Sequence, residues 1–203
     1  MARPYRRKDA YHQQAKREGF RSRAAYKLEQ IQRRARILRP GQRVIDLGCW
    51  PGGWLQVAAK LVGPGGRVAG LDLAPIDPPL EWANVVALSG DLTEARVRKE
   101  LLDAAGGPAD VLLSDAAPKL TGVRATDRAR EEALLEAIEA SLPELLKPGG
   151  TLLLKLMEGP EAQEVEKRLR ARFDSHRSLR PDASRKGTTE RYWLGDGFHE
   201  EER

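Results

Sequence analysis

Short runs of β-forming residues alternate with helical patterns between residues 43 and 172, and this alternation constrains the fold more than any other feature. The strand-like runs, rich in Val and Leu, fall at residues 43–47, 67–71, 85–88, 111–114 and 151–156. Helical patterns fall at residues 54–61, 93–105, 127–146 and 161–172. This order predicts an α/β domain with a mostly parallel sheet that helices cover on both faces. Two closing runs, 175–179 and 191–194, lie close together in sequence and predict an antiparallel pair at the sheet edge.

The chain of 203 residues has the size of one domain and contains no internal repeat or linker. We expect a flexible basic arm over residues 1–19, a folded domain over residues 20–196 and a short acidic tail over residues 197–203. The first helical pattern begins at Phe20 and ends before Pro40. Lys27 borders the buried face of that helix, where its ammonium group can reach a cleft beside the core.

Cysteine content and hydropathy restrict the class of protein. Cys49 is the single cysteine, so no internal disulfide can form, and three scattered histidines make no zinc-binding pattern. No apolar run approaches the roughly 18 residues of a membrane span, and residues 1–25 carry no signal-peptide core. We therefore predict a cytoplasmic protein without metal or membrane contact. No apolar surface stripe is left over, which favours a monomer.

Positive charge is concentrated at the start of the chain. Residues 1–43 hold 14 Lys and Arg against three acids, a net charge of +11, whereas the remainder carries −6. Such segregation favours a polyphosphate partner, and the excess of Arg over Lys favours forked contacts with phosphate. A lipid surface is the alternative, but Tyr5, Tyr11 and Phe20 make too sparse an apolar face for it. Nucleic acid is the favoured partner.

The loop after the first predicted strand, residues 46–54 (DLGCWPGGW), is the strongest local signal. Its glycines let backbone approach a ligand at the carboxyl edge of the sheet, where nucleotide-like ligands bind. The loop is neither a dinucleotide fingerprint nor a P-loop. Asp72 and Asp91 follow the next two strands, where they can accept ribose hydroxyls and an adenine amine. A ribose and adenine without pyrophosphate indicate S-adenosylmethionine, although each acid, Asp91 above all, could instead cap a turn.

Two further residues occupy positions that an exposed surface does not explain. Asp115 ends the hydrophobic strand at residues 111–114, and Lys155 interrupts a run of leucines. A lysine in a central strand must face a cleft or have a partner. Both residues lie at carboxyl ends of strands that we expect to be neighbours, so Asp115 can reach Lys155. The structural alternatives are a turn cap for Asp115 and a strand-end lysine that extends to solvent for Lys155.

From about Arg17 to Leu194, the sequence resembles the FtsJ-type (RlmE) ribosomal RNA 2′-O-ribose methyltransferases. The motifs that carry the resemblance are residues 21–28 (RSRAAYKL), 46–54, 113–118 (LSDAAP), 148–150 (PGG) and 180–185 (RPDASR). The resemblance implies a Rossmann-like methyltransferase fold, a seven-stranded sheet with a reversed last strand. It also implies S-adenosylmethionine as cofactor and, as substrate, a uridine in the A-loop of 23S rRNA within the large ribosomal subunit.

The family's functional residues carry over to matching positions. The catalytic set falls on Lys27, Asp115, Lys155 and Glu190, and the cofactor contacts fall on Gly52, Trp54, Asp72, Asp91 and Asp115. Spacing alone gives no role to Lys27 or Glu190, which could be a solvated helix residue and a polar edge-strand residue. The chain departs from the family in Cys49-Trp50, where small residues are usual, and in Thr188-Thr189 before Glu190, where Ser-Arg is common.

The chemistry implied is an in-line transfer of a methyl group to a ribose hydroxyl, with Lys155 as general base and Asp115 orienting it. Several alternatives remain open from the sequence. The acceptor could be tRNA or another RNA, or the chain could methylate a small molecule. A non-catalytic RNA-binding protein of ribosome assembly would explain the basic segment but not Asp115 and Lys155.

Overall fold

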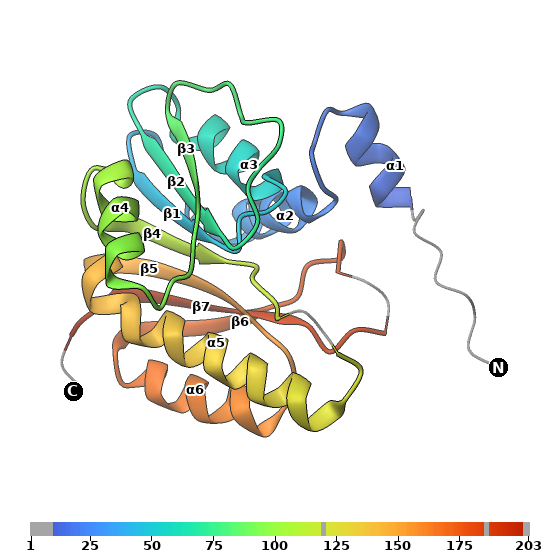
Figure 1. The fold of residues 1–203 in the computed structure, drawn as a ribbon, viewed down its shortest axis with the longest axis vertical. Helices are drawn as coiled ribbons and strands as arrows, with labels where there is room; N and C mark the ends of the chain where they lie inside the picture. The colour runs from blue at the N-terminus through green and yellow to red at the C-terminus, as the bar shows by residue number, and fades with distance from the viewer. Residues whose placement is uncertain (1–9, 119–120, 185–186, 201–203) are drawn as a thin grey trace.

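The structure is a computed structural model that describes residues 10–118, 121–184 and 187–200. Seven strands form one sheet in the order β3-β2-β1-β4-β5-β7-β6 (Figure 1). The strands are β1 (Arg43–Leu47), β2 (Arg67–Asp72), β3 (Val85–Ser89), β4 (Ala109–Ser114), β5 (Leu146–Leu156), β6 (Phe173–Leu179) and β7 (Arg191–Phe198). The first five strands pair in parallel, and β7 runs antiparallel between β5 and the edge strand β6. The predicted mostly parallel, seven-stranded α/β sheet is confirmed.

Helices cover both faces of the sheet. They are α1 (Ala10–Arg17), α2 (Ala24–Ala35), α3 (Gly53–Val62), α4 (Ala95–Ala105), α5 (Arg124–Leu145) and α6 (Pro160–Arg170). Side chains of α2 and α3 pack in one core, and those of α4, α5 and α6 pack in the other. Because β1, β2, β3 and β4 are parallel, the loops that follow them lie together at the carboxyl edge of the sheet.

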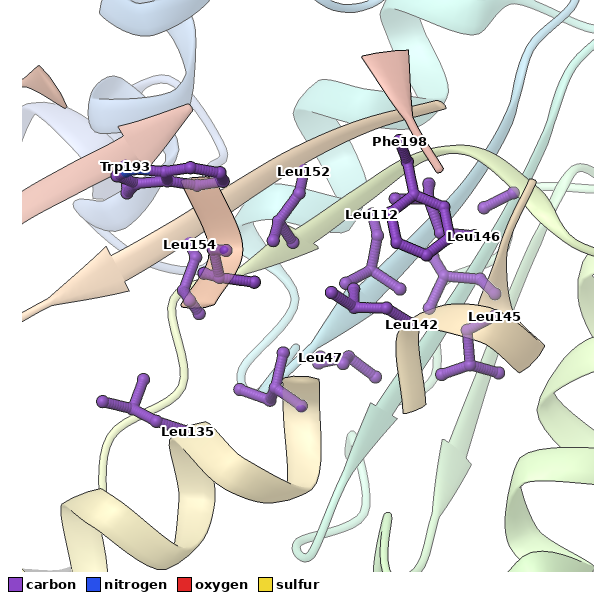
Figure 2. Close-up of a cluster of buried hydrophobic side chains, with 14 of the residues drawn as sticks. Leu47, Leu112, Leu135, Leu142, Leu145, Leu146, Leu152, Leu154, Trp193 and Phe198 are labelled. Carbon is purple, nitrogen blue, oxygen red and sulfur yellow. The ribbon is translucent and has the colours of Figure 1, made fainter. Parts of the chain in front are cut away.

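Alternation along the central strands explains why the sheet has two cores. In β5, Leu152 and Leu154 point to the α4–α6 side, and Leu153 points to the α2–α3 side. In β7, Trp193 packs in the core on the α4–α6 side, and Tyr192 packs in the core on the α2–α3 side. Figure 2 shows the core under α5, where leucines of the sheet meet those of the helix. Because successive strand residues face opposite ways, a continuous run of apolar residues fills both cores.

The arm predicted to be flexible is folded over part of its length. Residues 10–17 form α1, which lies beside α2 (Figure 1). Tyr26 of α2 explains the docking, because its ring centroid lies 5.6 Å from that of Tyr11 and 5.5 Å from that of Phe20. Ala15 is 2% exposed beneath these rings. Aromatic residues too sparse to form a stripe in sequence thus gather around one ring; residues 1–9 lie outside the described part of the chain.

The folded domain extends slightly beyond its expected end at residue 196. β7 continues to Phe198, whose side chain is buried with its ring centroid 5.3 Å from that of Phe173. Gly197 and Phe198, expected in the acidic tail, therefore belong to the sheet. The last three residues of that tail, 201–203, lie outside the described part of the chain.

Candidate active site

The register of three strands brings the predicted catalytic residues together. β4 pairs with β5 so that Ser114 lies opposite Leu154, which places Asp115 beside Lys155. β5 pairs with β7 so that Lys155 lies opposite Tyr192. Opposite residues of an antiparallel pair point to the same face, so Lys155 and Tyr192 both extend toward the end of β4.

Two lysines approach one carboxylate oxygen at this point. Lys155 Nζ lies 3.2 Å from Asp115 Oδ1 and donates a hydrogen bond to the Asp115 backbone carbonyl. Lys27 Nζ, from α2, lies 3.6 Å from the same Oδ1 atom and 2.8 Å from Glu190 Oε1. The four side chains are between 9% and 16% exposed. The predicted contact of Asp115 with Lys155 is confirmed, and Lys27 is not an ordinary solvated helix residue.

Tyr192 is a member of this cluster that the sequence interpretation missed. Its hydroxyl donates to Asp115 Oδ1 at 2.6 Å and accepts from Lys27 Nζ at 3.1 Å. Burial, together with the negative charges of Asp115 and Glu190, raises the pKa of Tyr192 well above its usual value. The phenol therefore stays protonated and acts as a donor. The alternation Glu190-x-Tyr192 before a buried strand was the available signal, since it puts both side chains on one face.

The segment before β7 holds Glu190 in place. Ser184 Oγ donates to Glu190 Oε1 at 2.8 Å, which leaves the carboxylate shared between the serine and Lys27. Arg34 of α2 fixes the start of this segment through the Arg180 carbonyl at 3.1 Å and the Asp182 carboxylate at 3.0 Å. The helix that carries Lys27 thus also anchors the segment that carries its partner.

A cleft of about 650 Å³ lies at the carboxyl edge of the sheet, next to this cluster. The loops after β1, β2, β3 and β4 and one side of α5 form its walls. Asp72 and Asp91, the two acids expected to contact the cofactor, line it together with Asp115, whereas Asp46, the acid at the end of β1, does not. Apolar groups of Leu92 and Leu134 lie among them, so the cleft combines a few carboxylates with an apolar surface. This composition suits an uncharged ring system bearing hydroxyl and amino groups.

The two outer acids are already engaged in hydrogen bonds with the backbone. Asp72 accepts from the Trp50 amide at Oδ2 and from the Ala74 amide at Oδ1, each at 3.0 Å. Asp91 Oδ1 accepts from the amide and the hydroxyl of Thr93, each at 2.8 Å, and these bonds lower the pKa of Asp91. The turn-capping interpretation of Asp91 is therefore realised, and it does not compete with a position lining the cleft.

Comparison with known proteins agrees with this geometry. A family model described as FtsJ-like methyltransferase matches residues 20–198. The chain belongs to the FtsJ-like methyltransferase family. Proteins named "Ribosomal RNA large subunit methyltransferase E" are similar along almost the whole chain. That of Desulfatibacillum aliphaticivorans is 41% identical over 93% of this chain and 89% of its own, and that of Pseudomonas aeruginosa is 40% identical over 95% and 92%.

Solved structures show the same fold. A protein described as a ribosomal RNA methyltransferase from Plasmodium falciparum has a TM-score of 0.73 and 26% identity, covering 88% of this chain and 98% of its own. Fibrillarin from Aeropyrum pernix, solved with natively bound S-adenosyl-L-methionine, has a TM-score of 0.64 and 17% identity, covering 84% of this chain and 75% of its own. At 17% identity, the similarity to fibrillarin establishes the fold alone.

Two of the expected cofactor residues of this FtsJ-like methyltransferase, Gly52 and Trp54, do not line the cleft. Gly52 precedes α3 with a φ of 108°, and a side chain there would meet Arg21 Cδ at 3.1 Å. Trp54 is 3% exposed, and its indole nitrogen donates to the Ala24 carbonyl at 2.8 Å. Its ring centroid lies 5.7 Å from that of Tyr192. A cofactor contact by either residue stays a prediction, because neither lines the cleft in this structure.

Asp46, at the end of β1, is a second residue whose environment the sequence did not reveal. It is fully buried, and neither carboxylate oxygen has a hydrogen-bond partner within the described part of the chain. Burial, with the nearby charges of Asp115 and Asp72, raises the pKa of Asp46 well above its usual value. Burial without a hydrogen-bond partner therefore favours the protonated form of Asp46.

The described residues contain no group of three or more His, Cys, Asp or Glu placed to hold a metal ion. In the same residues, no helix is both long and apolar enough to cross a membrane.

Proposed function

We propose that this FtsJ-like methyltransferase transfers a methyl group from S-adenosyl-L-methionine to a ribose 2′-hydroxyl, that of a uridine in the A-loop of 23S rRNA, in the large ribosomal subunit. The observation that carries the proposal is the approach of Lys27 and Lys155 to one oxygen of Asp115 at the end of the cleft. The names of the relatives support large-subunit RNA as the substrate. We further propose that the protein acts as a monomer in the cytoplasm.

The residues of the cleft fit the cofactor by the chemistry of their donor and acceptor groups. Asp72 would accept the ribose hydroxyls, and Asp91 would accept the adenine amine. The apolar groups of Leu92 and Leu134 would contact the ring faces. When bound, the cofactor supplies an electrophilic methyl group on a positively charged sulfur. Asp115 lies at the far end of the cleft, which places the lysine cluster at the end opposite to Asp91.

Lys155 is the residue proposed to act on the ribose hydroxyl. A ribose hydroxyl is almost fully protonated at neutral pH, so the reaction needs a group that removes its proton. Asp115 holds Lys155 through two acceptors, its backbone carbonyl and its carboxylate, and thereby fixes the amine at the cleft. A positioned base contributes roughly 10²–10⁴-fold to a rate, and correct placement of the reactants can remove about 7–11 kcal/mol from the barrier. Positioning is the larger effect.

Lys27, Glu190 and Tyr192 set the charge and geometry around this base. Lys27 is paired with Glu190 at 2.8 Å, and the Tyr192 hydroxyl bridges Lys27 and Asp115. The net charge of the two lysines and two carboxylates is zero when all four groups are charged. Loss of the Lys155 charge leaves one excess negative charge among these four side chains. In this proposal Lys27 and Glu190 hold groups in place and do not move protons.

The basic surface is proposed to bind the phosphates of the RNA. Arg33, Arg34, Arg36 and Arg39 are exposed on α2 and the turn after it, and Lys16 and Arg17 are exposed at the end of α1. The helix that carries Lys27 into the cluster thus presents exposed cations at its C-terminal end. A polyphosphate chain bound there would pass beside the end of the cleft.

Methyl transfer from labelled S-adenosyl-L-methionine to large ribosomal subunits that lack the modification tests this function. Wild type and Lys155→Ala are compared, with free 23S rRNA and tRNA as competing acceptors. Lys99→Ala is the matched control, because Lys99 is an exposed lysine on α4 that pairs only with its neighbour on the helix, Asp103. We expect label on subunits with wild type and Lys99→Ala and its loss with Lys155→Ala. Label on tRNA, or cofactor binding without transfer to any RNA, contradicts the proposed substrate.

A further inference from the structure

Two large apolar side chains are exposed at the mouth of the cleft. Trp50 is 59% exposed and Leu73 is 76% exposed, and both line the cleft. Trp82 and Val123 are the other large hydrophobic residues exposed in the described part of the chain, and neither lines it. Isolated exposed hydrophobic residues are ordinary, but two that share the rim of a cleft indicate a surface that a ligand covers.

The loop that carries Trp50 is firmly held, although its indole is exposed. The amides of Gly48 and Cys49 both donate to the Leu71 carbonyl, at 2.8 and 3.2 Å, and the Trp50 amide donates to Asp72 Oδ2 at 3.0 Å. Cys49 is 3% exposed and packs so closely on Gly70 that a side-chain carbon there would come within 2.7 Å of its sulfur. Cys49 thus faces the core and Trp50 the cleft, on a backbone tied to β2.

We propose that Trp50 packs against the nucleoside portion of the bound cofactor and closes the outer wall of the cleft. This inference rests on the proposed function, since it assumes that S-adenosyl-L-methionine occupies the cleft. Asp72, the acid expected to accept hydrogen bonds from the ribose hydroxyls, also accepts a hydrogen bond from the Trp50 amide. A ribose bound by Asp72 would therefore lie next to Trp50. An indole offers a flat apolar face of the kind that stacks on bases and sugars.

The position of Trp50 favours a cofactor contact over a contact with the target nucleotide. The loop is bonded to the end of β2, whereas Lys155 and Asp115 lie at the ends of β5 and β4. The sheet order places β1 between β2 and β4, so Trp50 and Lys155 lie on opposite sides of the β1 strand end. The target ribose must approach Lys155, on the side away from Trp50.

A contact with the nucleoside has a specific consequence for ligand preference. Trp50→Ala should weaken S-adenosylhomocysteine and adenosine by a similar factor, about 3- to 10-fold, because both contain the nucleoside. Trp50→Phe should retain most of the affinity. Trp82→Ala is the matched control, because Trp82 is 39% exposed on the loop before β3 and outside this cleft.

The experiment measures dissociation constants of S-adenosylhomocysteine and adenosine by calorimetry, and quenching of tryptophan fluorescence by S-adenosylhomocysteine, for the full chain and each variant. We expect quenching in wild type and Trp82→Ala and much weaker quenching in Trp50→Phe, in which Trp54 is the remaining tryptophan predicted to contact the cofactor. Equal thermal midpoints for wild type and Trp50→Ala would show that the variant is folded. Unchanged affinities for both ligands in Trp50→Ala, or a loss confined to S-adenosylhomocysteine with adenosine unaffected, overturn the inference alone. A wild-type chain that binds no S-adenosylhomocysteine overturns the proposed function together with it.

Discussion

Lys155 of β5 lies directly opposite Tyr192 of β7, and the amine of one and the hydroxyl of the other meet at the same oxygen of Asp115. Strand register, a property of the whole sheet, therefore fixes the geometry of the cluster. Asp115 accepts from Tyr192 at 2.6 Å and pairs with Lys155 at 3.2 Å. The orientation of this carboxylate consequently depends on a phenol that lies outside the motifs that carry the family resemblance.

Replacement of Tyr192 by Phe tests this dependence. Tyr192→Phe removes the donor to Asp115 and the acceptor for Lys27 while it keeps the ring in the core. A hydrogen bond to a charged group contributes about 1.5–3 kcal/mol, so we expect kcat/KM for RNA methylation to fall by roughly 10- to 100-fold. Steady-state kinetics with saturating cofactor measure the effect. Activity equal to wild type would show that Asp115 is positioned without the phenol.

The pair of Lys27 and Glu190 predicts non-additive stability effects. Lys27→Met leaves two carboxylates without their shared cation at a site where the side chains are only 10–16% exposed. Removal of one partner of a buried ion pair lowers the free energy of unfolding by up to about 3–5 kcal/mol. Lys27→Met combined with Glu190→Gln should therefore lose less unfolding free energy than the sum of the single variants. Urea denaturation measures all four proteins, and additive losses would argue against direct coupling.

Asp46 predicts a pH dependence of stability with a definite sign. Its folded pKa is raised above the unfolded value, so its protonated form favours the folded state, and stability falls as pH rises above the unfolded pKa. Asp46→Asn keeps a neutral side chain at every pH. The variant should gain thermal stability relative to wild type at pH 7.5, by about 2–4 °C for each 1 kcal/mol, and gain little at pH 4. A difference that is constant between the two pH values contradicts a raised pKa for Asp46.

Separate surfaces for RNA and cofactor predict different responses to salt. An RNA that contacts six or more phosphate-binding cations should lose about 10³-fold in affinity between 50 and 200 mM salt. The affinity for S-adenosylhomocysteine should change little, because the cleft is lined mainly by carboxylates and apolar groups, with Arg130 as its one cationic residue in the described part of the chain. Filter binding and calorimetry at matched salt concentrations measure the two ligands. Equal responses would show that one surface binds both.

The sequence was sufficient to predict the sheet because the pattern of burial is local. Each parallel strand is a short Val- and Leu-rich run, and the order of runs and helices admits few topologies. The docking of α1 could not be predicted in the same way. It depends on Tyr26, a residue of another helix, which collects Tyr11 and Phe20 around it. Contacts between distant residues leave no periodic trace in the chain.

In the candidate site too, the sequence pattern indicated some residues and not others. Asp115 and Lys155 stood out because a charge at the end of a buried strand demands a partner. The helical pattern placed Lys27 only at the border of a buried face, and the catalytic roles of Lys27 and Glu190 came from the resemblance. Their contact depends on the Arg34-anchored segment before β7. Tyr192 looked like an ordinary aromatic strand residue, and Asp46 like one more acid at the end of a strand. Their burial and contacts were set by register and by neighbouring loops, which the sequence pattern does not specify.

The position of the methyl group in the product tests the central claim most directly. Large subunits lacking the modification are incubated with the protein and S-adenosyl-L-methionine, the RNA is digested to nucleosides, and the products are identified by mass spectrometry. Lys155→Ala and Lys99→Ala are treated in parallel. The arrangement of Lys155, Asp115 and Lys27 predicts 2′-O-methyluridine in wild type and Lys99→Ala and its absence in Lys155→Ala. A nucleoside methylated on the base, or 2′-O-methyluridine undiminished in Lys155→Ala, would contradict the claim.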